Sequence, residues 1–266
     1  MKTSKSEFNQ YWNFVRKSSE NYDESLKQLP KRVQDIVKKD MGILPHHLST
    51  DHFYEMFVAE LKKLVPDFKI DSASQPILKS ISQYFSQDAE FIKDESFSFN
   101  KGILLMGGVG TGKTMLFKGL IETLNHFRYK DPHSWDVYAY NFFYVPSYAF
   151  AEGFSKKGFP IFDEGLPVNG STVHVTTPRL IIDDLGVENI CSHFGSTTNI
   201  IAEVIFRRYD NKVVKYAKSR HDNKAITFGT TNLDRKCLKA FYGDRAYSRM
   251  VEMMNFLIYE GNDRRH

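Results

Sequence analysis

The sequence predicts an α/β fold: a parallel sheet with helices on both faces, preceded by a small helical region. From about residue 101 onward, apolar stretches typical of strands alternate with helical patterns, as in sheets that are covered on both sides. A glycine-rich loop at 107–114 joins the first of these strands to the next helix. Residues 1–95 differ, because their apolar residues recur at helical spacing and prolines separate the segments.

Local pattern gives the expected elements of the α/β part. Strands are expected at 102–106, 142–146, 179–183, 225–230 and 255–260, and helices most clearly at 113–126, 197–218 and 233–242. The stretch 151–178 is rich in glycine and proline, so an inserted loop or short hairpin is expected there.

Two domains are expected, a helical N-terminal region at 1–95 and a larger α/β domain at 96–266, which meet at the polar stretch 94–100. The N-terminal region is interpreted either as an independent partner-binding module, which its distinct character favours, or as helices packed on the main domain.

The bulk composition excludes several classes of protein. The 266 residues carry a net charge of +4, which permits contact with nucleic acid without demonstrating it. The two cysteines provide neither a disulfide framework nor a zinc site. Since no apolar run is long enough for a signal sequence or a membrane span, we expect a soluble cytoplasmic protein that does not bind a membrane.

The loop at 107–114 fits the phosphate-binding template Gly-x-x-x-x-Gly-Lys-[Ser/Thr]. Glycines let backbone N–H groups turn toward phosphate oxygens, and the positive end of the following helix faces the same anion. Lys113 is expected to reach the β- and γ-phosphates of ATP, and the Thr114 hydroxyl to ligate Mg²⁺. The alternative is a glycine-rich turn that matches by chance. The expected nucleotide-binding residues are Gly107, Gly108, Val109, Gly110, Thr111, Gly112, Lys113, Thr114 and Met115.

Two further apolar runs end in polar residues, which a parallel sheet would place at its carboxyl edge, where ligands bind. The first ends in Asp183, expected to hold Mg²⁺ directly or through water, and Asp184, expected to orient or polarise the attacking water. The second ends in Asn232, expected to hydrogen-bond the γ-phosphate or that water. The alternatives are an Asp-rich turn after a strand and an Asn that caps the next helix.

Arg245 and Arg249 fall on one face of a predicted helix. They are interpreted as phosphate contacts or, alternatively, as a solvated basic stripe. In ATPase assemblies such an arginine usually comes from a neighbouring subunit. Arg264 and Arg265 near the end of the chain offer further phosphate contacts, or are simply solvated.

Together these motifs resemble the AAA+ ATPases of the bacterial DnaC-type and DnaI-type helicase loaders and the IstB-type transposition helpers. The resemblance covers about residues 98–266, and rests on 107–114, 180–186, the helix around 205–210, Thr-Thr-Asn at 230–232 and Gly-Asp-Arg-Ala-Tyr-Ser-Arg at 243–249. It implies an AAA+ P-loop NTPase fold and an ATP-hydrolysing homo-oligomer.

The resemblance also assigns roles to single residues. It implies that Asn232 is sensor 1, that Arg249 is the trans-acting finger with Arg245 beside it, and that an arginine of the ending 259–265 is a sensor-2-like contact. Because the chain stops directly after the last strand, the usual helical lid is expected to be absent. Many family members have Asp-Glu where this chain has Asp183 and Asp184, so hydrolysis is expected to be slow.

Residues 146–157 match a family helix that touches single-stranded DNA. By this resemblance Tyr148, Phe150 and Phe154 stack on bases, while Lys156 and Lys157 track phosphates. The alternative is that this aromatic stripe belongs to the core.

Three functions follow as hypotheses. The first is a loader or remodeller of a DNA-bound machine, such as a replicative helicase, as in DnaC. The second is an IstB-like helper that delivers a transposase to DNA, and the third is a nucleotide-gated adaptor with little turnover. Residues 1–95 are expected to bind the helicase or the transposase.

Overall fold

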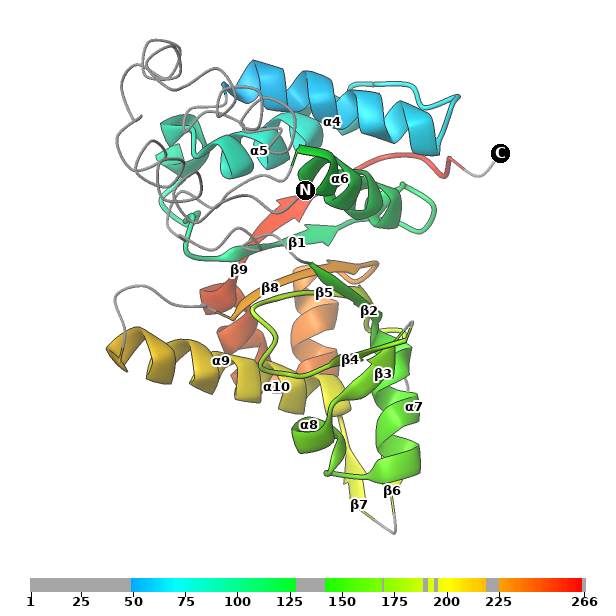
Figure 1. Ribbon diagram of the computed structural model, residues 1–266, viewed down its shortest axis with the longest axis vertical. Helices are drawn as coiled ribbons and strands as arrows, with labels where there is room; N and C mark the ends of the chain where they lie inside the picture. The colour runs from blue at the N-terminus through cyan, green and yellow to red at the C-terminus, as the bar shows by residue number, and fades with distance from the viewer. Residues whose placement is uncertain are drawn as a thin grey trace, which may run out of the picture.

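The computed structural model describes residues 49–127, 142–168, 170–188, 191–193, 196–218 and 225–264. These residues form a five-stranded parallel sheet with helices on both faces (Figure 1), which confirms the predicted fold class. The strands are β1 (Gly102–Met106), β2 (Phe143–Pro146), β5 (Arg179–Leu185), β8 (Ile226–Thr231) and β9 (Met254–Ile258). Their order across the sheet is β2-β5-β8-β1-β9, so β1 lies between β8 and β9.

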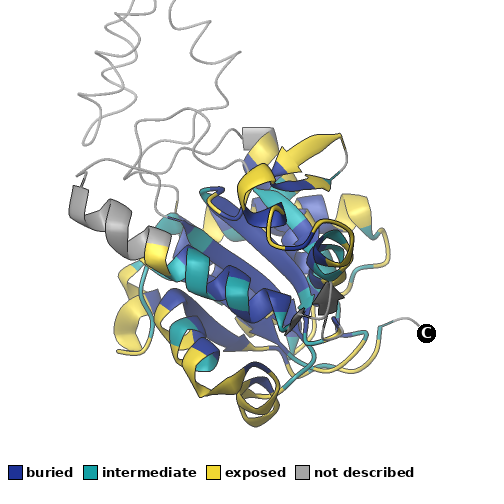
Figure 2. Cartoon of the chain, turned by 90° about the horizontal axis from the view of Figure 1, so that it is seen from below, coloured by how far each residue is buried: buried dark blue, intermediate teal, exposed yellow. Residues whose placement is uncertain are grey.

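Alternate residues of β1 point to opposite faces of the sheet, and a different group of helices buries each face. Ile103 and Leu105 join a hydrophobic cluster with residues of α4 (Thr50–Leu64), α5 (Ser74–Ser86) and α6 (Lys113–Phe127). Leu104 and Met106 join a second cluster with residues of α7 (Ser147–Lys157), α9 (Ile200–Lys218) and α10 (Arg235–Met253). Figure 2 shows the buried strands between helices whose outward faces are exposed.

Two helices differ from their predicted bounds. α9 begins at Ile200 rather than at 197, because β7 (Ser196–Thr198) pairs with β6 (Cys191–His193) in a small hairpin. The helix predicted at 233–242 continues as α10 to Met253, with a break at Gly243, where φ is 80° and ψ is 162°. Of the helices in the described residues, none is both long and apolar enough to cross a membrane.

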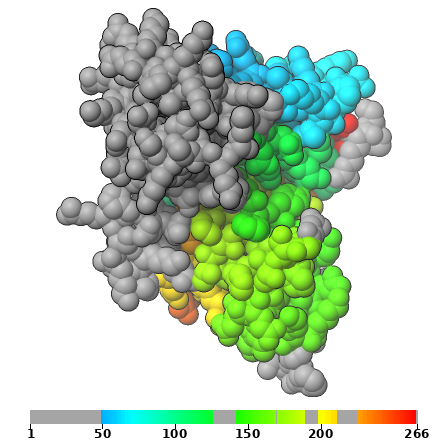
Figure 3. Space-filling model, viewed as in Figure 1, coloured from blue at the N-terminus to red at the C-terminus, as the bar shows by residue number. Residues whose placement is uncertain are grey.

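The insertion at 151–178 is only partly loop. It contains the second half of α7, the short α8 (Ile161–Glu164) and the expected hairpin, formed by β3 (Leu166–Val168) and β4 (Ser171–Val173). Figure 3 shows this part of the chain, green to yellow, at one end of the molecule. The far end of the insertion is fixed by Arg208, whose fully buried guanidinium donates to the carbonyls of Val175 and Thr177 at 2.6 and 2.8 Å. Burial lowers the pKa of Arg208 to about 9.

The described N-terminal helices pack on the sheet. α4 contributes Phe57 and Leu61 to the cluster that contains β1 and α6. Tyr84 of α5 meets Phe228 of β8 edge to face, with ring centroids 6.1 Å apart, and the 3-10 helix η1 (Ala89–Lys93) adds Phe91. Between 49 and 95 these helices thus pack on the main domain, and a partner-binding role of residues 1–95 stays a prediction. Residues 1–48 lie outside the described residues.

The contact between α4 and α6 depends on Gly119, where a Cβ would collide with the side chain of Leu61. Gly119→Ala is therefore expected to lower the free energy of unfolding by about 1–3 kcal/mol, because overpacking forces the neighbours to shift. Urea denaturation measures this change. If α4 did not pack there, helix propensity alone would stabilise the same variant by up to about 1 kcal/mol. The sign of the change in the free energy of unfolding therefore distinguishes the two cases. A double variant that combines Gly119→Ala with Leu61→Ala is expected to lose less free energy of unfolding than the sum of the two single variants.

Candidate nucleotide site

The phosphate loop connects the end of β1 to the start of α6. Gly110 and Gly112 have φ angles of 76° and 100°, which only glycine adopts without strain. Gly107, where the loop begins, lies so close to the carbonyl oxygen of Tyr259 that a Cβ would collide with it. Only glycine therefore fits at this position. The Thr111 hydroxyl donates to the carbonyl of Gly108 at 3.1 Å and closes the curve of the loop. The loop thus has the conformation in which backbone N–H groups form an anion cradle at a helix N-terminus.

Lys113 joins the loop to the end of β8. Its ammonium donates to the carbonyls of Gly107 and Gly108 at 2.8 and 2.6 Å, and to Oδ1 of Asn232 at 2.8 Å. Only 5% of Lys113 is exposed, so the charge lies inside the loop. Two residues predicted from separate motifs are therefore in direct contact.

The carboxylate of Asp183 collects donors from three elements. The Thr114 hydroxyl of α6 lies 3.1 Å from both of its oxygens, and the Thr230 hydroxyl of β8 donates to Oδ1 at 2.6 Å. Tyr144 of β2 donates its phenol hydroxyl to Oδ2. Burial, and then the hydrogen bond to Asp183, raise the pKa of Tyr144 far above its usual value. Thr114 and Asp183 therefore come together as the sequence predicts.

Tyr144 and Thr230 were missed by the sequence reasoning. Both stand in strands whose apolar pattern hides which polar side chain points toward the carboxyl edge. For Thr230 the available signal was the motif Thr-Thr-Asn at 230–232, whereas Tyr144 is identified only in the structure, where β2 pairs with β5 and Tyr144 lies beside Ile181.

Asp184 lies where β5 departs from its regular hydrogen-bond pairing with β8. The register against β8 shifts between Ile182 and Leu185, and Asp184 has a φ angle of 55°. Asp tolerates this left-handed conformation better than most residues. Its backbone N–H donates to the Thr230 hydroxyl at 2.8 Å, and its carbonyl accepts from Ser147 at 2.7 Å. The bulge thus holds Asp184 at the tip of the strand by its main chain.

The donor set fits a magnesium nucleotide. No group of three or more His, Cys, Asp or Glu side chains in the described part of the chain could hold a metal alone. Mg²⁺ commonly takes one or two protein oxygens and completes its shell with phosphate oxygens and water. Thr114 and Asp183 supply such a pair beside the cradle, and the metal would offset the charge of the phosphates there.

Arg245 and Arg249 lie beyond the break in α10, packed on α9. The Arg249 guanidinium stacks on Tyr209, 3.9 Å from the ring centroid, and pairs with Glu252 at 3.0 Å. Arg245 lies over Phe206 at 4.7 Å. The structure therefore does not bring these two side chains into the site of their own chain.

Arg264 is anchored away from the phosphate cradle. Its backbone N–H donates to the carbonyl of Gly110 at 3.0 Å, but its guanidinium bonds the carbonyl of Lys69 at 3.0 Å and pairs with Asp71. In this structure the C-terminal segment braces the loop, and the charge of Arg264 faces the α4–α5 connection. Arg265 lies outside the described residues.

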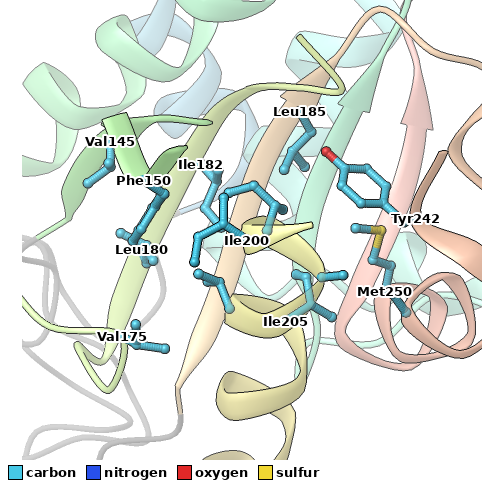
Figure 4. Packing of buried hydrophobic residues seen from close by; sticks show 14 of the residues in the cluster. Val145, Phe150, Val175, Leu180, Ile182, Leu185, Ile200, Ile205, Tyr242 and Met250 are labelled. Carbon is cyan, nitrogen blue, oxygen red and sulfur yellow. The ribbon is translucent and has the colours of Figure 1, made fainter. Parts of the chain in front are cut away.

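The predicted DNA-stacking role fails for two of the three aromatic residues of α7. Phe150 is 1% exposed and Phe154 is 0% exposed, and Figure 4 shows Phe150 among Val145 and Leu180 in the core. Rings buried in this way cannot stack on bases, so this stripe belongs to the core. Tyr148 is exposed.

The two lysines of α7 both make ion pairs within the chain. Lys156 pairs with Glu152 at 2.6 Å and Lys157 with Glu164 at 2.9 Å.

Strand order and phosphate loop together define the class. A loop of this type after β1, Asp183 near the end of β5 and a parallel sheet of order β2-β5-β8-β1-β9 make this an α/β fold of the P-loop type.

Comparison with other proteins finds similarity in structure and none in sequence. No family model matches the chain, and no curated protein matches it in sequence. Among solved structures it is similar to the DnaC helicase loader, at 17% identity and a TM-score of 0.46 over 77% of this chain and 98% of that one. It is also similar to AMPPCP-bound DnaA from Aquifex aeolicus, at 16% identity and a TM-score of 0.45 over 75% of this chain and 51% of that one.

The Tyr144 hydroxyl is expected to stabilise the buried carboxylate of Asp183. Tyr144→Phe should lower the free energy of unfolding by about 1.5–3 kcal/mol, the usual range for a hydrogen bond to a charged group. Tyr148→Phe is the matched control, because Tyr148 lies four residues further along the chain, in α7, and is 58% exposed. Equal losses in the two variants, measured by chemical denaturation, would contradict the assigned hydrogen bond.

Proposed function

We propose that the protein binds ATP with Mg²⁺, hydrolyses it slowly in a homo-oligomer, and thereby loads or remodels a DNA-bound machine, as a replicative helicase loader does. The observation that carries the proposal is the convergence of Lys113, Thr114, Asp183 and Asn232, from the start of one helix and the ends of two strands, around one anion cradle. A glycine-rich turn that matched the template by chance would not need these partners.

Each residue then has a defined task. The loop amides and Lys113 hold the β- and γ-phosphates, and Lys113 exchanges its carbonyl contacts for phosphate oxygens. Thr114 and Asp183 hold the metal. Asp184 orients the attacking water, while Asn232 bonds that water or the γ-phosphate.

The nucleotide-gated adaptor is the second candidate, and one observation favours it. Asp184 has a side chain one methylene shorter than Glu, and hydrogen bonds on both sides fix its backbone in a bulge. A carboxylate that cannot reach the attacking water would leave ATP binding intact and ATP turnover low.

The proposed partner of residues 1–95 is a replicative helicase, with a transposase as the alternative. α4 and α5 already bury one face against α6 and the sheet. The described part of this range therefore offers a partner only the outward faces of these helices. Contact with single-stranded DNA through 146–157 would have to use Tyr148 and the two lysines, since the phenylalanines are buried.

Two substitutions separate binding from hydrolysis. Lys113→Ala is expected to abolish ATP binding in a fluorescent-nucleotide titration, because the loop loses its positive charge. Asp184→Asn keeps the left-handed backbone accessible and removes only the charge. It is expected to retain binding and to lower turnover by about 10²–10⁴, the usual contribution of a general base. Unchanged turnover in Asp184→Asn would remove the catalytic role of that carboxylate, and ATP binding by Lys113→Ala would refute the site.

Arg249 is proposed to complete the site of a neighbouring subunit. Arg249→Ala is expected to lower turnover of the assembled protein by on the order of 10³–10⁵ while leaving ATP affinity near that of wild type. Mixing it with Lys113→Ala tests action in trans. The mixture should regain activity, since a subunit with an intact loop then meets an intact arginine. A mixture as inactive as either variant alone would contradict the proposal.

A further inference from the structure

A buried polar pair, Glu188 and Tyr242, lies beside the nucleotide site and has no part in the chemistry proposed above. Glu188 is 4% exposed and Tyr242 is 6% exposed. The phenol hydroxyl of Tyr242 donates to Oε1 of Glu188, and the N–H of Gly186 donates to Oε2 at 2.9 Å. Figure 4 shows the Tyr242 ring directed toward Leu185. Burial, and then the charge of Glu188, raise the pKa of Tyr242 well above its usual value.

One end of this pair closes the turn that carries the acidic residues. The chain turns back after Asp184, where the N–H of Val187 donates to the Asp184 carbonyl at 3.3 Å, and Gly186 has a φ angle of 93°. Thr231 of β8 donates to the carbonyl of Leu185 at 2.7 Å. Glu188 completes this turn by accepting from the N–H of Gly186, so the carboxylate that Tyr242 holds is hydrogen-bonded to the main chain two residues after Asp184.

The other end of the pair lies at the break in α10. Tyr242 is the last residue before Gly243, whose φ of 80° and ψ of 162° interrupt the helix. The second half of α10 starts from this point and carries Arg249 onto α9, where it stacks on Tyr209. Tyr242 is therefore one of the buried residues that set the place and direction of that second half, together with Ala246, Met250 and Met253.

We infer that Glu188 and Tyr242 are positioning residues that couple the acidic turn of the nucleotide site to the arginine-bearing half of α10. The inference rests on the proposed function, because it assumes that the site binds ATP and that α10 meets a neighbouring subunit. A role in packing alone would not require a polar pair at this position. A buried carboxylate and phenol lose hydration, and an apolar pair of the same volume would fill the space without that loss.

Tyr242→Phe in the full chain tests the inference, with Tyr84→Phe as the matched control. Tyr84 is also a buried tyrosine, 7% exposed, and it donates one hydrogen bond, 2.8 Å long, to the carbonyl of Lys101. It belongs to the cluster on the opposite face of the sheet. Both variants lose one buried hydroxyl bond, so a purely structural effect would be common to the two.

Three quantities are measured: ATP affinity, self-association by sedimentation with a non-hydrolysable ATP analogue, and turnover against protein concentration. Tyr242→Phe should keep ATP affinity within about twofold while ATP-dependent self-association and assembled turnover weaken about tenfold, the scale on which such paths modulate coupling. Tyr84→Phe should change none of the three beyond twofold. Glu188→Gln should restore most of the loss seen in Glu188→Ala, because the amide accepts from Gly186 and donates to Tyr242.

The outcomes separate this inference from the proposed function. A wild-type protein that fails to bind ATP refutes both. A wild type that binds ATP and self-associates, with Tyr242→Phe equal to it in assembly, refutes the coupling alone. Equal losses in Tyr242→Phe and Tyr84→Phe also refute it, because they show a structural effect only.

Discussion

The buried carboxylate of Asp183 is the constraint on which the nucleotide site depends. A buried charge is tolerated only when it is compensated, and here hydroxyl groups of Thr114, Thr230 and Tyr144 converge on it. These three donors belong to α6, β8 and β2, so satisfying one carboxylate fixes the start of the phosphate-loop helix against three strands of the sheet. The position of Lys113 and its contact with Asn232 follow from the same arrangement.

The nucleotide site lies between two layers of helices, each of which packs on its own face of the sheet. On one face α4 and α5 close the core, and the connection between them holds the C-terminal segment that braces Gly110. On the other face the insertion and α10 close the core, and their polar links to the site are Ser147 and the Glu188–Tyr242 pair. These contacts connect the nucleotide site to the helices on both faces of the sheet.

The outcome of each prediction depended on whether its evidence was local. The strands and the loop were predicted because their signals, apolar runs and glycine spacing, lie within a few residues of each other. The docking of α4 was left open, since an amphipathic helix looks the same whether it faces a partner or its own sheet. Whether Phe150 and Phe154 face DNA or the core was left open for the same reason, because their spacing gives a stripe but not the direction it faces. The roles of Tyr144, Thr230 and Glu188 were missed because the local pattern does not show which distant partner a polar side chain meets.

The sequence by itself determined the α/β fold, the phosphate loop and the identity of the acidic and amide residues that meet it. These depend on backbone chemistry and on periodicity, which adjacent residues express. Only the tertiary structure decided which hydroxyl groups surround Asp183, that α4 and α5 belong to the core, and that Arg264 faces Asp71. Those contacts join residues distant in the chain, and the register of the strands and the packing of helices on them select the side chains that meet.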